Sequence, residues 1–148
     1  MSWTDLVSHA DSVLALYGGA PSLDGFRLEA ITLEGDAVHL RGDFAALPDP
    51  PPERWADRRK TRVSVRIDAS GLAEAEVRGS PRLRFNGIAG HEGQPTDLSI
   101  TAADSTWKVP NGSERPHIVV SGEADFVSFR FVCESVSVRA WGEEPHVL

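Results

Sequence analysis

Apolar and polar residues alternate with a period of two along much of this 148-residue chain, and no other feature constrains its fold as strongly. The alternation is clearest over 62–67, where polar residues separate Val63, Val65 and Ile67. Because successive side chains of a β-strand point to opposite faces of a sheet, this pattern predicts a strand with one buried face. Comparable short segments recur over 25–141, so the sequence predicts about nine or ten short strands.

Turn signals separate these segments, and they predict how the strands connect. Examples are Glu34-Gly35-Asp36, Ala69-Ser70-Gly71 and Pro110-Asn111-Gly112-Ser113. Consecutive strands joined by tight turns predict a mainly β fold built as an antiparallel meander. A curved open sheet, a partial barrel and a sandwich all satisfy the pattern. In the first hairpin the apolar phase changes between Leu28 and Ile31, which predicts a β-bulge near Ala30.

A helical segment is predicted for residues 1–18, ahead of the strands. Ser2 is suited to cap its first turn, and Asp5 stands where a capping box needs an acid. Apolar residues then recur at helical spacing as far as Gly18, whose freedom to adopt a positive φ favours a helix end. A break near His9–Asp11 would divide the segment into two short helices.

Length and composition are typical of one globular domain over 1–148. Hydrophobic residues make up 41% of the chain, and the polar end 142–148 is expected to fray. No apolar run reaches the roughly 18 residues of a membrane-spanning helix, and 1–18 lacks the basic residues of a secretory signal. The lone Cys133 has apolar neighbours and is expected to be a packing thiol. The expected location is therefore a reducing cytoplasm, without membrane contact.

The net charge of −7 is unevenly distributed and bears on the kind of partner. Residues 1–52 carry a balance of −6, residues 53–84 one of +4, and residues 85–148 one of −5. Nucleic-acid binding needs an excess of Lys and Arg, so the acidic whole argues against it. Opposite fields accelerate the encounter of two proteins, and the acidic balance therefore suits a basic protein partner. A simpler interpretation is that the charge keeps a small domain soluble.

No motif in the sequence points to catalytic, cofactor-binding or metal-binding residues, and the chain is expected not to be an enzyme. Its five histidines have neither an i, i+4 spacing nor the neighbouring cysteines of a zinc site. His91 lies in a glycine-rich loop near carboxylates and is the best candidate for a general base, although a solvated turn residue is the simpler interpretation. Glu74 and Glu76 share a strand face, and there a solvated pair is favoured over a glycosidase pair. His39 is expected on the polar face of its strand.

A proline-rich arm, Leu47 to Trp55, leads into a basic loop. Its prolines favour an extended conformation that would present Trp55 at a fixed place. Arg54, Trp55, Arg58 and Arg59 are the candidate partner-binding residues, because exposed Trp and Arg are typical binding anchors. Alternatively, Trp55 seals one end of the core and the arginines pair with the acidic blocks on either side.

Taken together, these landmarks resemble the immunity protein 50 family of bacterial polymorphic toxin systems. The matching residues are Trp3 and Leu6, Tyr17-Gly18-Gly19, Pro21-Ser22-Leu23, and the Leu47-Pro48, Pro51-Pro52 and Trp55 positions of the arm, followed by the strand 63–67. The resemblance covers the chain in layout and is specific in its N-terminal half. It implies a cytoplasmic protein that binds a cognate toxin domain and neutralises it by steric occlusion, with no chemistry of its own.

Two other functions are compatible with the sequence. One is a binding module for a carbohydrate or peptide, using an open sheet face and a ring such as Trp107 or Trp141. The other is a small β-barrel enzyme that uses His91 and a carboxylate. The sequence leaves open the identity of a toxin partner, the face that binds it and the oligomeric state.

Overall fold

The computed structural model describes residues 2–49, 52, 62–79, 94–108, 114–125 and 127–143. They form one 3₁₀ helix, one short α-helix and six β-strands. The elements are η1 (Trp3–Asp5), α1 (Asp11–Tyr17), β1 (Phe26–Glu34), β2 (Ala37–Phe44), β3 (Arg62–Gly79), β4 (Gln94–Lys108), β5 (Glu114–Glu123) and β6 (Val127–Glu143).

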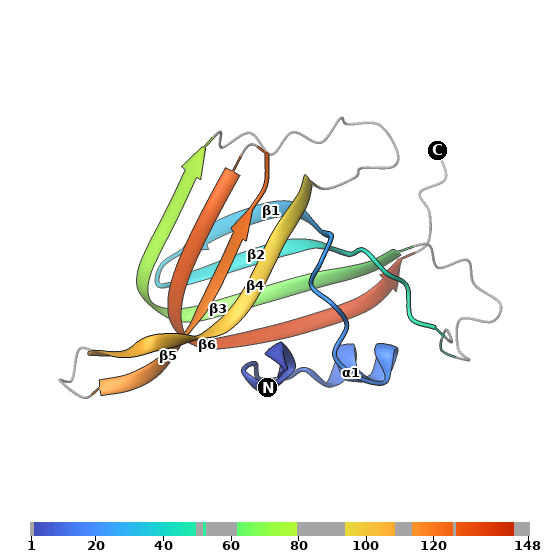
Figure 1. Cartoon of the computed structure of the whole chain (residues 1–148), viewed down its shortest axis with the longest axis horizontal. Helices are drawn as coiled ribbons and strands as arrows, with labels where there is room; N and C mark the ends of the chain where they lie inside the picture. The colour runs from blue at the N-terminus through green and yellow to red at the C-terminus, as the bar shows by residue number, and fades with distance from the viewer. Residues whose placement is uncertain are drawn as a thin grey trace.

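The six strands close into an irregular ring in the order β1-β2-β3-β6-β5-β4, with every neighbouring pair antiparallel (Figure 1). Two three-stranded meanders, β1-β2-β3 and β4-β5-β6, make up the ring. The long β3–β6 ladder joins them on one side, and a short seam between 26–28 of β1 and 94–96 of β4 joins them on the other. The predicted mainly β, antiparallel fold with an N-terminal helical segment is confirmed, in a form nearest to the partial barrel.

Strands β3 and β6 each belong to two sheets, because both bend midway (Figure 1). Their halves 62–70 and 135–143 pair with each other, and 63–69 of β3 also pairs with β2, so that these halves form the first sheet with β1 and β2. Their halves 72–79 and 127–133 form the second sheet with β5 and β4. Strands that pass from one sheet to another through a bend are the usual corners of orthogonally packed β structures.

The corner of β3 corrects the turn predicted at Ala69-Ser70-Gly71. Gly71 does adopt a positive φ of 67°, but the strand continues through it, with a register shift between Leu72 and Glu74. A Cβ at Gly71 would lie 2.9 Å from Cβ of Glu134, so glycine also lets β6 bend against β3. Glycine with a positive φ serves a bulge as well as a tight turn. Within the described ranges the structure has six strands rather than nine or ten short ones, because predicted segments such as those on either side of Gly71 merge into one long strand, and the strand predicted at 83–85 lies outside these ranges.

The core fills the space between the two sheets. Two glycines make room for phenylalanine rings there: a Cβ at Gly42 would lie 2.6 Å from Phe26 Cζ, and one at Gly122 would lie 2.5 Å from Phe129 Cζ. Glycine on a strand commonly marks such a close approach. The other fully buried large side chains come from both sheets and from α1: Val13, Leu28, Val38, Leu40, Val63, Val65, Ile67, Val120, Phe131, Val132 and Val136.

The local signals of the N-terminal segment are confirmed. Ser2 and Asp5 form the expected capping box on η1, and Gly18 ends α1 with a φ of 69°. The break between the two helices falls at His9, whose φ is 59°. The β-bulge predicted near Ala30 is also present, as a register shift between Leu28 and Ala30 in the β1–β2 ladder.

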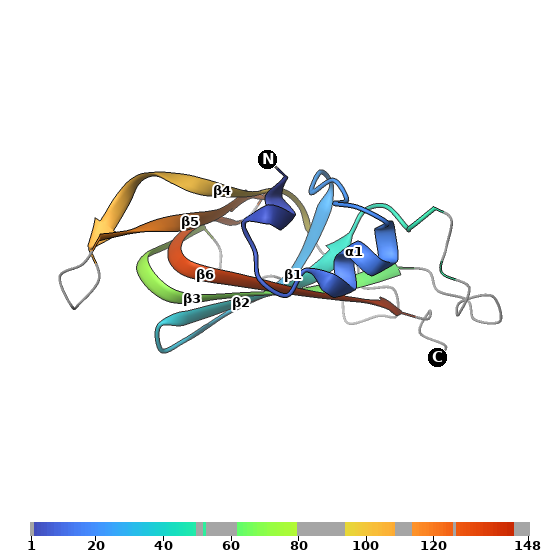
Figure 2. The same cartoon turned by 90° about the horizontal axis from the view of Figure 1, so that it is seen from below.

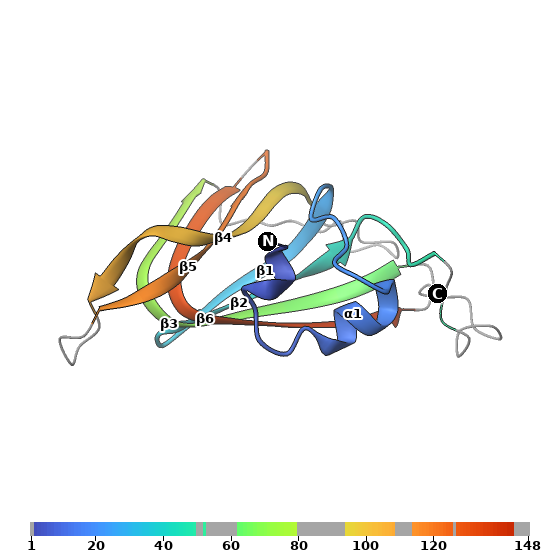
Figure 3. The ribbon, with the colours of Figure 1, turned by 60° about the horizontal axis from the view of Figure 1, so that its bottom comes forward.

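The N-terminal segment lies along β6 (Figures 2 and 3). The ladder between β5 and β6 ends at Cys133, so the rest of β6 has an edge to be covered. Ser8 N–H donates to Val136 O at 2.7 Å, and Ala140 N–H donates to Ser12 Oγ at 3.0 Å. An edge strand with unsatisfied backbone groups is a site of unwanted pairing, and this cover removes part of it.

Strand β6 extends to Glu143, so Gly142 and Glu143 belong to the sheet although fraying was expected from 142 onward. The remaining tail, 144–148, lies outside the described residues. Within the described ranges, neither helix has the length or the apolar character needed to cross a membrane.

Candidate functional site

The partner-binding residues predicted from the sequence, Trp55, Arg54, Arg58 and Arg59, lie outside the described residues. His91, the candidate general base, also lies outside them. Their roles therefore stay predictions. The two polar clusters on the sheets are brought together by strand pairing, and the sequence did not predict either cluster.

A surface hollow on the polar face of the second sheet, which we call the acidic pocket, has a volume of about 570 Å³. Four strands contribute, because their outward-facing residues form two rows across the sheet. One row runs from Asp97 through Glu123 and Ser128 to Arg78, and the other from Ser99 through Ser121 and Arg130 to Glu76. Leu98, Gly122 and Phe129, which lie between the two rows, and Asp24, from the segment before β1, complete the lining.

Charges in the acidic pocket are compensated at the β3 side. Arg78 forms an ion pair with Glu76, and Arg130 Nη1 lies 3.3 Å from Glu74 Oε1. The predicted polar face of Glu74 and Glu76 is confirmed, and both acids have an arginine partner. On β4 and β5, Ser99 Oγ and Ser121 Oγ share a hydrogen bond of 2.8 Å.

At the β4–β5 side, by contrast, two acids face each other. Asp97 and Glu123 are direct partners in the β4–β5 ladder, and within the described part of the chain neither has an ion pair. Like charges placed directly opposite on neighbouring strands destabilise a sheet. A cationic group bound between them would remove this repulsion, so this side of the acidic pocket is suited to a guanidinium or ammonium group.

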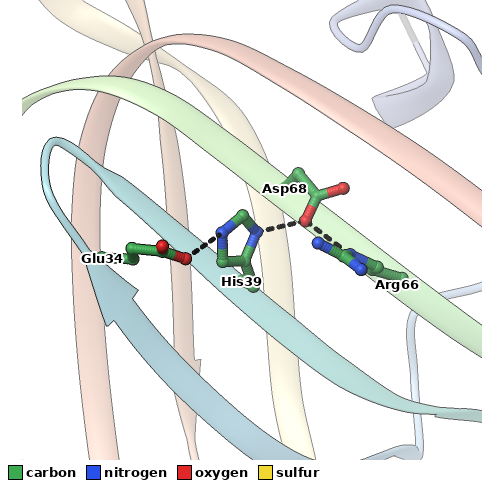
Figure 4. A network of polar contacts seen from close by, with 4 residues as sticks. All are labelled: Glu34, His39, Arg66 and Asp68. Carbon is green, nitrogen blue, oxygen red and sulfur yellow. Dashed lines mark hydrogen bonds and ion pairs between the residues drawn. The ribbon is translucent and has the colours of Figure 1, made fainter.

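A second polar cluster links three strands of the first sheet (Figure 4). His39 lies between two carboxylates: its Nδ1 contacts Asp68 Oδ1, and its Nε2 lies 3.9 Å from Glu34 Oε2. Arg66 Nε donates to the same Asp68 oxygen at 2.9 Å. The prediction that His39 occupies the polar strand face is confirmed.

Electrostatics in this cluster favour the charged form of Asp68. Burial raises the pKa of the Asp68 carboxyl, but hydrogen bonds and positive charge from Arg66 and His39 outweigh it and hold the pKa below its ordinary value. Both described contacts of the His39 ring are to carboxylates. The cluster is therefore best understood as a cross-strand link between β1, β2 and β3.

The thiol of Cys133 is a packing group, as predicted. It is fully buried, its Sγ lies 3.4 Å from Ile118 O, and burial raises its pKa to about 12. A nucleophilic cysteine instead needs a lowered pKa and access to solvent. Across the described ranges, no three His, Cys, Asp or Glu side chains gather closely enough to hold a metal ion.

Comparison with known protein families, with curated proteins and with solved structures gave no match.

Proposed function

We propose that this chain is an immunity protein, which binds a cognate toxin domain of a bacterial polymorphic toxin system in the cytoplasm. It neutralises the toxin by covering the toxin's active site and catalyses no reaction itself. The resemblance of the N-terminal landmarks and the arm supports this family. The geometry adds support for a basic partner.

One observation carries the choice of a basic partner: the opposed pair Asp97 and Glu123 at the acidic pocket. A pair of like charges without a described counter-ion costs stability in the free protein, and a basic side chain of a partner would offset that cost on binding. The pocket is built on paired strands, so binding requires little ordering of the backbone.

The acidic pocket is compatible with inhibition by steric occlusion. A toxin that acts on a polyanionic substrate needs a basic cleft, and an acidic surface competes for that cleft by charge as well as by shape. The interface predicted from the sequence, Arg54, Trp55, Arg58 and Arg59, would supply additional contacts around the anchor.

The test is co-expression of this chain with the products of the genes adjacent to its own. We expect one adjacent product to be toxic when expressed alone, and to be tolerated and co-purified when this chain is present. An adjacent gene whose product shows no toxicity, or toxicity that this chain does not relieve, contradicts the proposal.

The role of the acidic pocket is tested separately with the double variant Asp97→Asn/Glu123→Gln. Its dissociation rate from the toxin should rise by about tenfold or more, because both carboxylates that would pair with a basic side chain of the toxin are neutralised. The control Asp11→Asn/Asp36→Asn changes the net charge equally at exposed positions outside the pocket, and it should bind like the parent. Equal weakening by both doubles would assign the effect to net charge and contradict an anchor at the pocket.

A further inference from the structure

A second hollow of about 230 Å³ lies on the outer face of the first sheet, between β6 and the N-terminal segment. It is distinct from the acidic pocket and shares none of its residues. The residues that line it are His9, Ser12, Asp68, Ser137, Val138 and Arg139.

Two parts of the chain that are far apart in sequence build this hollow. On β6, Ser137 and Arg139 face outward, because the alternate residues Val136, Val138 and Ala140 are buried. The N-terminal segment is held beside them, since Ser8 pairs with Ser137 and Ser12 Oγ accepts the hydrogen bond from Ala140 N–H.

Three side chains around the hollow can donate hydrogen bonds. The Ser12 hydroxyl accepts from the backbone, so its own proton is left to donate. The Ser137 hydroxyl and the His9 ring have no described partner. The acid on the lining, Asp68, already accepts from Arg66 and contacts His39 through the same oxygen.

One of two neighbouring arginines of the outer face, Arg139, lines the hollow. Arg139 is the register partner of Arg66 across the β3–β6 ladder, which places two arginines opposite each other on the outer face. Arg66 has Asp68 as its counter-ion, whereas Arg139 has no ion pair among the described residues. Like charges opposite each other on neighbouring strands are unfavourable, and an anion beside Arg139 would relieve the repulsion.

The backbone at His9 is held in an uncommon conformation. Its φ of 59° makes it the only non-glycine residue with a positive φ in the described ranges, and its side chain is exposed at the rim. Such a conformation persists where neighbouring contacts fix it, here the bonds of Ser8 and Ser12 to β6. The ring is thereby kept beside the hollow.

We infer that this hollow binds a phosphate group, with Arg139 as its counter-ion and the hydroxyls of Ser12 and Ser137 and the ring of His9 as further donors. Arginine binds phosphate oxygens in a bidentate manner, and hydroxyl donors to either side suit a tetrahedral anion. The group is either free inorganic phosphate or the phosphate of a small ester. This site is independent of the toxin interface proposed above.

The test is an amide NMR titration of the whole chain at constant ionic strength, with inorganic phosphate, with phosphoserine and with acetate. We expect saturable shifts for the amides of Ser12, Ser137 and Arg139 with both phosphates. Tighter binding of phosphoserine would identify an ester as the ligand, and equal or tighter binding of inorganic phosphate would identify the free anion. Shifts that do not saturate, or equal saturation with acetate, would overturn the assignment.

Variants tie the binding to the hollow. Arg139→Gln should weaken phosphate binding by about tenfold or more, because the charge-assisted contact is lost. Ser137→Ala should weaken it by a smaller factor and leaves every charge in place. The control Arg130→Gln removes an arginine from the same strand outside the hollow, and it should bind phosphate like the parent. Equal affinity of Arg139→Gln and the parent, with both folded, would overturn the proposal.

Discussion

Tyr17, at the end of α1, connects the N-terminal segment to the ring. Its hydroxyl donates to Ala46 O at 2.7 Å, and its ring packs edge-on against Phe44 with centroids 5.6 Å apart. Trp3 reaches the same ring and donates from Nε1 to Pro21 O at 2.8 Å. Partial burial of Tyr17 disfavours the phenolate and raises the pKa of its hydroxyl to about 12.

Because Tyr17 is the single tyrosine of the chain, its titration can be followed directly. We expect the phenolate absorbance near 295 nm to appear with a midpoint near pH 12 in the folded protein, and near pH 10 after unfolding in denaturant. Since the folded pKa is the higher of the two, the stability that Tyr17 contributes is complete below about pH 10 and is lost as the pH rises toward 12. A midpoint near pH 10, with the far-UV β signal intact, would contradict this description. The variant Tyr17→Phe is the control, since it abolishes the signal.

Among the elements, α1 contributes to stability through one face only. Val13 and Leu16 are buried in the core, whereas Leu14 is 39% exposed. A seven-residue helix is too short to be stable alone in water, so its conformation depends on this packing and on the cap at Gly18. The helix thus covers one side of the ring. On the same side, the rest of the N-terminal segment covers β6.

Two leucines on α1 provide a matched test of this face. We expect Leu16→Ala to lower the free energy of unfolding by about 2–4 kcal/mol, because it leaves a cavity in the core. Leu14→Ala makes the same chemical change on the exposed side and should cost less than about 1 kcal/mol. Chemical denaturation of the two variants and the parent measures the difference. Similar losses for both variants would mean that α1 does not dock through this face.

Elements specified by neighbouring residues could be predicted from the sequence. The capping box of Ser2 and Asp5, the helix end at Gly18 and the bulge near Ala30 all depend on residues a few positions apart. The corner at Gly71 was predicted as a turn, because a positive φ at a glycine is compatible with a tight turn and also with a bulge inside a continuous strand. What decides between them is the β6 strand, which follows more than fifty residues later and continues the ladder past the glycine.

The same limit applies to the candidate sites. Asp97 and Glu123 are unremarkable in the sequence, and only the β4–β5 register makes them neighbours. Arg139 meets His9 and Ser12 because the N-terminal segment docks on a strand at the other end of the chain. Local patterns revealed His39 on a polar face, but not the partnership with Asp68, which depends on the β2–β3 pairing.

On the scale of the whole molecule, the two joints of the ring are unequal. The β3–β6 ladder runs from Arg62 and Glu143 to Gly79 and Val127, whereas the β1–β4 seam spans only 26–28 and 94–96. Local openings start where few backbone bonds and little buried surface hold elements together. The seam is therefore the expected point at which the ring first opens.

Hydrogen exchange measured by mass spectrometry tests this order. We expect peptides from 63–69 and 129–133 to exchange slowest, with protection approaching that of global unfolding. Peptides that contain 94–96 should exchange faster, since the seam can open while the β3–β6 ladder is intact. Equal protection of the seam and the long ladder would show that the ring opens only as one unit.

The central position of β6 has a consequence for how the protein is made. This strand is the last described element to leave the ribosome, yet β3, β5 and the N-terminal segment all use it as a partner. Until β6 emerges, β3 lacks its longest strand partner, and Ser8 and Ser12 lack the backbone groups to which they bond in the folded protein. Synthesis therefore passes through an interval in which neither sheet can be completed, and apolar strands exposed during such an interval favour association between nascent chains.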